Sequence, residues 1–332
     1  MTGGTTSSPE DRLAGLRAWI VTDGKAGDEN QCLGIAQALG LDAELRRIPA
    51  SSPFGWLAPW GPIDPRQGPR RPGGALHGHL PDLVLASGRR AVPYLRACRR
   101  LGAGFSAFLK DPRTGADSAD FIWVPEHDLL RGQRVFTTTT SPHLVSAARL
   151  AEARKSPDRR LSALTGKRVA VLLGGDSRHL QFTDADIERL VRDLRRLSGV
   201  GCSLMVTASR RTPDSLRYAV QGLTRDTGGF FWDGDGGNPY IAMLALADSI
   251  VATSDSVNMV SEAVATGVPV LLSEIAGTPP RHGAMYAALK RAGALTGFDG
   301  TLVDLRYSPI DATPVIARAL ADAYIERHRG QV

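Results

Sequence analysis

The stretch TSDSVNMVSEAVATGVPVLL, residues 253–272, contains the pattern that decides the fold. An apolar run, Ser249–Ala252, lies just before it, and a second apolar run, Val268–Leu272, ends it. Between them lie small polar residues and a helix-like segment with one acid, Glu262. A strand, a helix and a second strand in this order are typical of a parallel sheet. We predict that both strands are covered on two faces, because neither run alternates apolar with polar residues.

The same unit recurs along the chain. In the first half, WIVTDGKAGDENQCLGIAQALG predicts a strand at Ala18–Thr22, a loop over residues 23–31 and a helix that ends at Gly40. In the second half, the pattern restarts at KRVAVLLGGDSRHLQFTDADIERLVRDLRRL, where Thr183 and Asp186 have capping-box spacing. The restart predicts the α/β class, with two Rossmann-like doubly wound domains that face each other across a cleft.

We divide the chain into four parts. Residues 1–14 are expected to be disordered, residues 15–150 to form an N-terminal Rossmann-like domain, and residues 160–311 to form a C-terminal nucleotide-binding domain. The last part, residues 312–332, is expected to be a helix that closes one of the two domains, with packing on the N-terminal domain as one arrangement.

The segment 51–80 is rich in Pro, Gly and Trp and lacks periodicity. It places Trp56 and Trp60 ahead of several arginines, a composition that fits an interfacial membrane patch. The alternative is a loop that buries its tryptophans against the first domain. We favour this alternative because no helical period organises the segment.

Composition excludes several classes of protein. The chain has 332 residues, of which 42% are apolar and 22% charged, as in ordinary soluble domains. We interpret the net charge of +6 as spread along the chain, which favours phosphate-bearing ligands or anionic lipid head groups and argues against nucleic acid. Neither the cysteines nor the histidines have metal-ligand spacing, so no metal or cofactor is expected. With no signal peptide or membrane-spanning run, we expect a cytoplasmic protein, with attachment to the inner membrane as the alternative.

The loops that follow strands hold the candidate binding residues, because ligands of open α/β sheets bind there. Glycine allows a ligand close to the backbone, a helix N-terminus attracts phosphate, and arginine binds phosphate with two donors. The same residues also form ordinary turns, N-caps and solvated charges, and both interpretations stay open. The candidates are Gly24, Gly27, Gly174, Gly175, Ser209, Arg210, Arg211, Ser254, Asp255, Ser256, Asn258 and Glu262.

Candidates for catalysis are fewer. Asp23 and His127 each follow a predicted strand and are our candidates for a general base. Tyr286 and Lys290 have the YxxxK spacing of short-chain dehydrogenases and epimerases, but the glycine fingerprint GxGxxG is missing. We therefore interpret this pair as part of an ordinary helix.

At these motifs the chain resembles known families. ATSDSVNMVSEAVATGVPVLL and LLGGDSRHLQFTDADI resemble the nucleotide-sugar motifs in the second domain of GT-B glycosyltransferases. In those enzymes a helix N-terminus faces the diphosphate and a glutamate early in the helix holds the ribose. The resemblance implies that role for Glu262, and diphosphate or sugar contacts for Ser254, Asp255, Ser256 and Asn258.

A second resemblance covers most of the chain. The motifs WIVTDGKAGDENQCLGIAQALG, PDLVLASGRRAVPYLR, VPEHD, LLGGDSRH, ASRRTP, GNPYIAMLALAD and TSDSVNMVSEAVATGVPV look like the elongated-mitochondria fission-factor family. Its plant members act in mitochondrial fission, and its bacterial relatives are often labelled nucleoside-diphosphate-sugar epimerases. The resemblance implies a GT-B-like fold.

Together, these patterns give one leading hypothesis and two alternatives. The leading hypothesis is a metal-independent GT-B-type glycosyltransferase that binds a nucleoside diphosphate sugar. Gly174, Gly175, Arg210 and Arg211 would then contact phosphates, while Gly24 and Gly27 would shape the acceptor side. One alternative is a non-catalytic scaffold that recruits a partner at a membrane surface. The other is a nucleoside-diphosphate-sugar epimerase.

Overall fold

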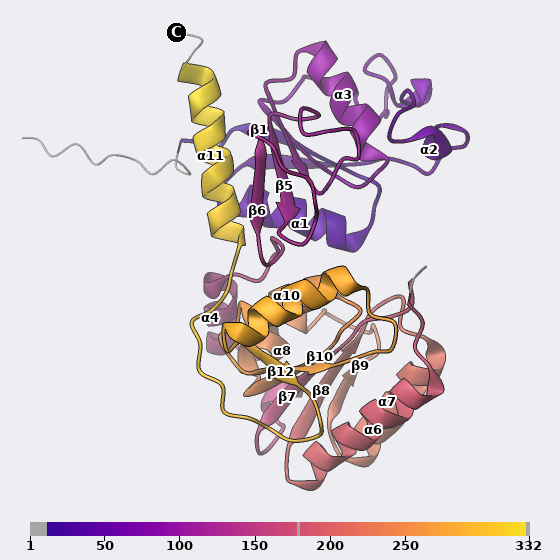
Figure 1. The fold of residues 1–332 in the computed structure, drawn as a ribbon, viewed down its shortest axis with the longest axis vertical. Helices are drawn as coiled ribbons and strands as arrows, with labels where there is room; N and C mark the ends of the chain where they lie inside the picture. The colour runs from indigo at the N-terminus through magenta and orange to yellow at the C-terminus, as the bar shows by residue number, and fades with distance from the viewer. Residues whose placement is uncertain (1–11, 178–179, 330–332) are drawn as a thin grey trace, which may run out of the picture. The chain divides into compact units, whose positions relative to one another are not determined.

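The computed structural model describes residues 12–177 and 180–329, and the chain divides into two compact units. The first unit runs to Leu144 and resumes at Ala312, and the second covers Val145–Asp311 (Figure 1). Most of the segment 1–14, which the sequence predicts to be disordered, lies outside the described residues.

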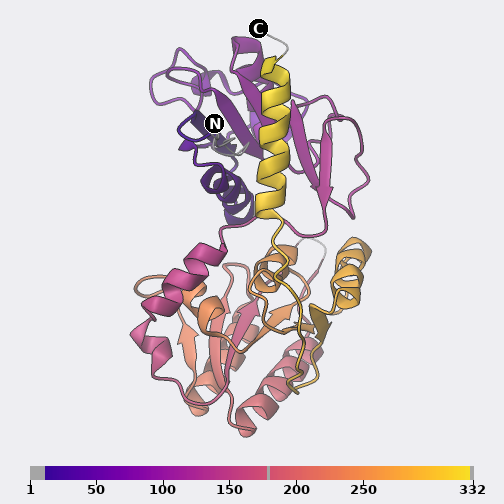
Figure 2. The ribbon, with the colours of Figure 1, turned by 90° about the vertical axis from the view of Figure 1, so that its left-hand side faces the viewer.

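The first unit is built on a six-stranded parallel sheet with the order β2-β1-β3-β4-β5-β6. Helices pack on both faces of this sheet, and the C-terminal helix runs alongside it (Figures 1 and 2). The strands are β1 (Arg17–Thr22), β2 (Asp42–Arg47), β3 (Leu83–Ser87), β4 (Phe105–Leu109), β5 (Phe121–Pro125) and β6 (Val135–Thr138), and the main helices are α1 (Ala26–Ala38), α3 (Ala91–Leu101) and α11 (Thr313–Arg329).

Alternate residues of these strands supply two cores. Ile20 and Leu85 point to the face covered by α1 and α11, where Ile316 and Leu320 are fully buried. The neighbouring strand residues point to the other face, which α3 covers together with parts of the segment 51–80. Burial on both faces explains why the strands are continuously apolar.

The first helix begins earlier than the sequence predicts. We expected a loop over residues 23–31, but α1 already begins at Ala26. Its first turn contains Asp28 and Glu29, and acidic side chains there interact favourably with the positive end of the helix dipole. The polar residues that suggested a loop therefore stabilise the helix start.

The second unit has a six-stranded parallel sheet with the order β12-β11-β10-β7-β8-β9. Helices α6 and α7 cover one face of the sheet, while α4, α8, α9 and α10 contribute to the core on the other. The strands are β7 (Arg168–Leu173), β8 (Ser203–Ala208), β9 (Phe230–Trp232), β10 (Ser249–Thr253), β11 (Val270–Ser273) and β12 (Leu295–Gly297). The helices are α4 (Ala147–Lys155), α5 (Arg159–Ser162), α6 (Asp184–Gly199), α7 (Asp214–Asp226), α8 (Tyr240–Leu246), α9 (Val257–Val264) and α10 (Pro280–Arg291).

Helix α6 begins as its sequence predicts. The hydroxyl of Thr183 accepts a hydrogen bond from the backbone N–H of Asp186, and the carboxylate of Asp186 accepts one from the backbone N–H of Thr183. This reciprocal pair confirms the capping box.

Each sheet has a point where the strand order reverses. In the first sheet the point lies between β1 and β3, and in the second it lies between β7 and β10. The prediction of two Rossmann-like domains is confirmed, and ligands of such sheets bind at the carboxyl ends of the strands beside this point. No helix within residues 12–177 and 180–329 is long and apolar enough to cross a membrane.

The segment 51–80 contradicts the interpretation that we favoured. It forms a short helix, α2 (Phe54–Leu57), and a 3-10 turn, Pro65–Gln67, yet Trp56 is 78% exposed and Trp60 is 69% exposed. The prediction that these tryptophans are buried against the first domain is wrong. Other residues of the segment, such as Leu76, supply the packing instead.

Candidate functional site

In the second unit, three loops meet at the carboxyl edge of the sheet. They follow β7, β8 and β10, and hydrogen bonds connect all three. Two of these strands, β7 and β10, flank the point where the strand order reverses. The sequence predicts twelve candidate binding residues in the whole chain, and nine of them lie in these loops or at the start of α9. They are Gly174, Gly175, Ser209, Arg210, Arg211, Ser254, Asp255, Ser256 and Asn258.

Asp255 holds these loops together. Its carboxylate accepts hydrogen bonds from the backbone N–H of Gly175 at 2.7 Å and from the hydroxyl of Thr253 at 2.6 Å. The guanidinium of Arg211 lies 3.9 Å away, and only 2% of the Asp255 side chain is exposed. Burial raises the pKa of Asp255, and these hydrogen bonds oppose the rise. The geometry gives this carboxylate a bracing role within the protein.

The two glycines are required by the close approach of the loops. A Cβ atom on Gly174 would lie 2.1 Å from a carboxylate oxygen of Asp255, and one on Gly175 would lie 2.1 Å from the backbone carbon of Arg211. Both glycines are buried. Their small size therefore serves loop packing.

The loop after β8 contains two arginines, of which Arg211 is hydrogen-bonded within the described protein and Arg210 is not. Arg211 donates hydrogen bonds to the carbonyls of Gly175 and Asp176, and the Ser209 hydroxyl donates to the carbonyl of Gly174. Arg210 is exposed and makes no ion pair within the described part of the chain. Arg210 is therefore available to an anionic ligand at this edge.

The start of α9 is accessible. Ser256 is its N-cap, and its hydroxyl accepts a hydrogen bond from the backbone N–H of Met259. Ser254 is buried and accepts a hydrogen bond from the backbone N–H of Ile275 at 2.8 Å. Because the residues from Ser256 to Met259 are all partly exposed, the positive end of the helix dipole faces solvent in this unit.

Glu262 lies two turns into α9 and points inward. Its carboxylate accepts a hydrogen bond from the hydroxyl of Tyr240, the first residue of α8, and only 8% of the glutamate is exposed. The pKa of Glu262 is raised to about 7. Burial causes the rise, and the hydrogen bond from Tyr240 partly opposes it. The alternative that Glu262 faces solvent is wrong.

The first unit has its own polar cluster where the strand order reverses. Asp23 pairs with Lys25 at 3.0 Å, and Asp28 pairs with Lys110 at 3.0 Å. A Cβ atom on Gly88 would lie within about 3 Å of both carboxylates, so both acids lie close to this glycine. One oxygen of each acid, Oδ1 of Asp23 and Oδ2 of Asp28, is buried without a hydrogen-bond partner in the described protein. Such an oxygen can accept a proton or a hydroxyl hydrogen bond.

The second candidate base lies elsewhere on this sheet. His127 follows β5, whereas Asp23 follows β1, and β3 and β4 separate these strands. Three strand spacings of about 4.8 Å separate the two strand ends by roughly 14 Å. Gly24 has φ +81° and an open surrounding, and Gly27 lies in the first turn of α1, so both are near Asp23 in the chain and in the fold.

The YxxxK pair is part of α10 and has structural contacts. The buried hydroxyl of Tyr286 donates a hydrogen bond to the carbonyl of Ser254 at 2.8 Å, and Lys290 pairs with Glu274 at 3.0 Å. Within residues 12–177 and 180–329, no three His, Cys, Asp or Glu side chains gather in a way that would hold a metal ion.

Sequence reasoning missed three residues of these clusters. Tyr240 donates a hydrogen bond to Glu262, and Thr253 donates one to Asp255. Asp28 lies near Asp23, beside Gly88. Thr253 and Asp28 could have been predicted from the sequence, since each lies within five residues of a predicted candidate. Tyr240 gave no such signal, because 22 residues separate it from Glu262 and only the packing of α8 on α9 joins them.

Comparisons with known proteins identify relatives along most of the chain. The family model "Mitochondrial fission ELM1" matches residues 26–324. "Mitochondrial fission protein ELM1" of Arabidopsis thaliana is 25% identical over 90% of this chain and 88% of its own length. "Uncharacterized protein RP120" of Rickettsia prowazekii is 33% identical, over 31% of this chain and 30% of its own length.

Solved structures show the same fold at low identity. UDP-GlcNAc 2-epimerase from Neisseria meningitidis, bound to UDP-GlcNAc, aligns with a TM-score of 0.54 and 11% identity over 93% of each chain. The UDP-GlcNAc 2-epimerase from Methanocaldococcus jannaschii has a TM-score of 0.54 and 12% identity over 92% of this chain and 98% of its own. The MnaA–UDP structure of S. aureus has a TM-score of 0.53 and 11% identity over 95% of this chain and 89% of its own.

Proposed function

The chain belongs to the mitochondrial fission ELM1 family, and from that premise we propose that it binds a nucleoside diphosphate sugar at the carboxyl edge of the second sheet. The observation that carries the proposal is the convergence of three loops where the strand order reverses, beside the accessible start of α9. Ligands of open α/β sheets bind at such points. Two solved structures with this fold contain UDP-GlcNAc or UDP, and they support a uridine nucleotide as the first probe.

The diphosphate is assigned to the start of α9 and to Arg210. The helix dipole favours an anion there, and Arg210 is an exposed arginine of the neighbouring loop that makes no ion pair within the described residues. Ser256 and Asn258 lie at the same helix start and are our candidates for polar contacts. Gly174, Gly175, Ser254 and Asp255 shape the loops, as their contacts within the protein indicate.

Glu262 is assigned to the ribose. One carboxylate oxygen accepts the hydrogen bond from Tyr240, which leaves the other to accept from a ligand hydroxyl. A glutamate with a pKa of about 7 is partly protonated near neutral pH, so ligand binding should favour its ionised form.

The proposed reaction is glycosyl transfer without a metal. A base removes the proton of an acceptor hydroxyl, the hydroxyl oxygen bonds to the anomeric carbon, and the bond from that carbon to the diphosphate breaks. We assign the base to Asp23, because its buried Oδ1 has no hydrogen-bond partner in the described protein. The positive helix end and Arg210 stabilise the departing diphosphate.

Ligand-dependent thermal stability tests this proposal. UDP, UDP-GlcNAc and other nucleoside diphosphates are added to the full-length protein. A ligand at about 100 times its Kd adds roughly 2.7 kcal/mol, which should raise Tm by roughly 5–10 °C for a unit of this size. Arg210→Gln should weaken the shift, whereas Arg195→Gln, which changes an exposed arginine of α6, should leave it intact. No shift with any nucleotide would refute the proposal and favour a non-catalytic scaffold.

Epimerisation of a nucleotide sugar is the second candidate. The missing GxGxxG motif excludes only the epimerases that carry it, and two solved structures with this fold are UDP-GlcNAc 2-epimerases. If the protein consumes a UDP-sugar without an acceptor and releases its epimer, this candidate replaces glycosyl transfer.

A further inference from the structure

An exposed apolar surface lies beside α3 in the first unit. Trp56 is 78% exposed, Trp60 69%, Leu57 49% and Leu101 43%. We define the tryptophan–arginine surface as these four residues together with Arg96 and Arg100 of α3. Large apolar side chains that gather on a soluble protein mark an interaction site.

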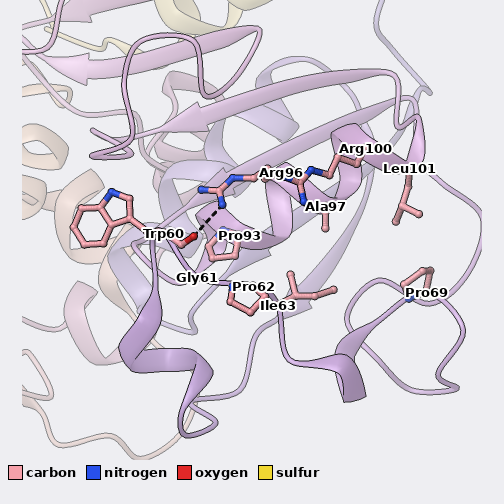
Figure 3. Close-up of a pocket in the computed structure, with 10 residues that line it drawn as sticks. All are labelled: Trp60, Gly61, Pro62, Ile63, Pro69, Pro93, Arg96, Ala97, Arg100 and Leu101. Carbon is pink, nitrogen blue, oxygen red and sulfur yellow. Dashed lines mark hydrogen bonds between the residues drawn. The ribbon is translucent and has the colours of Figure 1, made fainter.

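The backbone that carries the tryptophans is held firmly. Arg89 donates hydrogen bonds to the carbonyls of Gly55, Trp56 and Ala58. Arg96 donates to the carbonyls of Pro59 at 3.0 Å and Trp60 at 3.2 Å. Figure 3 shows Arg96 reaching the Trp60 carbonyl while the indole extends away from Pro62 and Ile63. These bonds hold the backbone of the loop that carries the two exposed indoles.

The charge of the protein is concentrated in the same region. Residues 51–101 contain eight arginines, two aspartates and no lysine or glutamate, which gives a formal charge of +6. This value equals the net charge of the whole chain, so the remaining residues sum to zero. The interpretation that the charge is spread along the chain is wrong. The segment 51–80 and α3 pack on the same face of the first sheet.

Two adjoining hollows lie in this region and share Arg96 and Arg100. The first, of about 470 Å³, is lined mainly by apolar side chains, which include Pro62, Ile63 and Leu101 (Figure 3). The second, of about 340 Å³, is lined by four arginines and Asp120. Asp120 pairs with Arg99 and Arg327, whereas Arg100 makes no ion pair within the described residues. An apolar hollow thus adjoins a cationic one.

We propose that the tryptophan–arginine surface docks on a lipid bilayer that contains anionic phospholipid. Indole side chains prefer the interface between hydrocarbon and water, and guanidinium groups pair with phosphates. Basic residues near an anionic leaflet add to the attraction. The apolar lining of the larger hollow suits acyl chains and offers little hydrogen bonding to nucleic-acid bases, so we place lipid before nucleic acid. This proposal is independent of nucleotide binding in the second unit.

Vesicle co-sedimentation of the full-length protein tests the proposal. Binding is measured to phosphatidylcholine vesicles and to vesicles that also contain about one third phosphatidylglycerol. We expect binding to the anionic vesicles alone, and its loss in 1 M salt. The double variant Trp56→Ser, Trp60→Ser should lower the partition coefficient at least about tenfold, and Arg100→Gln about fivefold.

Matched controls separate the surface from general effects. Val200→Ser and Arg195→Gln change an exposed apolar residue and an exposed arginine of the second unit, and both should bind vesicles as the wild type does. Quenching of tryptophan fluorescence by brominated phosphatidylglycerol should disappear in the double tryptophan variant. The proposal is overturned if anionic vesicles do not bind, if the tryptophan variant binds unchanged, or if the same variants lose binding to nucleic acid and not to vesicles.

Discussion

The hydroxyl of Tyr240 donates a hydrogen bond to the carboxylate of Glu262, and this bond joins the first residue of α8 to the second turn of α9. Burial raises the pKa of both groups above their ordinary values. The pair therefore holds a carboxyl group that changes its charge near neutral pH at the edge where we place the nucleotide.

The first prediction concerns pH. The pKa of Glu262 rises from 4.5 to about 7 on folding, so the folded protein binds this proton more tightly than the unfolded chain does. Stability from this group is complete below pH 4.5 and is lost as the pH rises towards 7. We expect Glu262→Gln to remove that loss, so that the variant is more stable than the wild type above pH 7 by a few kcal/mol, at about 1.4 kcal/mol per pKa unit.

Urea unfolding from pH 4 to pH 8 measures this difference. Glu188→Gln, which changes an exposed glutamate of α6, should follow the wild type at every pH. A difference between Glu262→Gln and the wild type that stays constant over this range would show that Glu262 does not titrate as described.

The second prediction concerns the glycine pair. Gly174→Ala places a Cβ atom 2.1 Å from the Asp255 carboxylate, so the loops must move apart. We expect a loss of roughly 1–3 kcal/mol, typical of overpacking. Gly222→Ala, in α7 with no atom within 4 Å, should instead stabilise by about 0.5–1 kcal/mol. Denaturant midpoints compare the two, and equal effects would contradict the packing of these loops.

The third prediction concerns the acids of the first unit. Lys110→Met removes the partner of Asp28, whose side chain is only 6% exposed, and should destabilise by about 1–3 kcal/mol. Lys155→Met breaks an exposed pair with Glu152, where both side chains are more than 70% exposed, and should change stability by less than about 0.5 kcal/mol. Thermal unfolding measures both, and similar values would mean that Asp28 is more hydrated than its burial indicates.

The fourth prediction concerns the C-terminal helix. Leu320 is fully buried in the core that α1 and the first sheet share with α11. Leu320→Ala should cost about 2–5 kcal/mol, whereas Val315→Ala, at a residue that is 52% exposed, should cost much less. Hydrogen exchange should show the loss in peptides from β1 and β3. Unchanged exchange in these peptides would show that α11 does not belong to the core of the first unit.

Much of the fold could be predicted because its strands are short apolar runs that follow one another at regular spacing. The strand predicted at Ala18–Thr22 is β1, which begins one residue earlier at Arg17, and the helix predicted within residues 312–332 is α11. The start of α1 was not predicted correctly. Asp28 and Glu29 are polar residues typical of loops, but in the first turn of a helix they interact favourably with its dipole.

The candidate site was predicted by location more than by role. Residues such as Ser254 and Asp255 could be placed in loops that follow strands, but their partners lie more than twenty residues away, at Ile275 and Gly175. The exposure of Trp56 also depends on residues distant in the sequence. Arg89, just before α3, and Arg96, within α3, donate hydrogen bonds to backbone carbonyls of the loop that contains Trp56. Periodicity reports the burial of a regular element and says little about an irregular segment.

Hydrogen exchange of the full-length protein with and without millimolar UDP-GlcNAc tests the central claim most directly. The account predicts slower exchange in peptides that cover residues 208–213 and 253–264, and a smaller effect in Arg210→Gln. Identical exchange at the carboxyl edge of the second sheet, with this nucleotide sugar and with every other nucleotide tried, would contradict it.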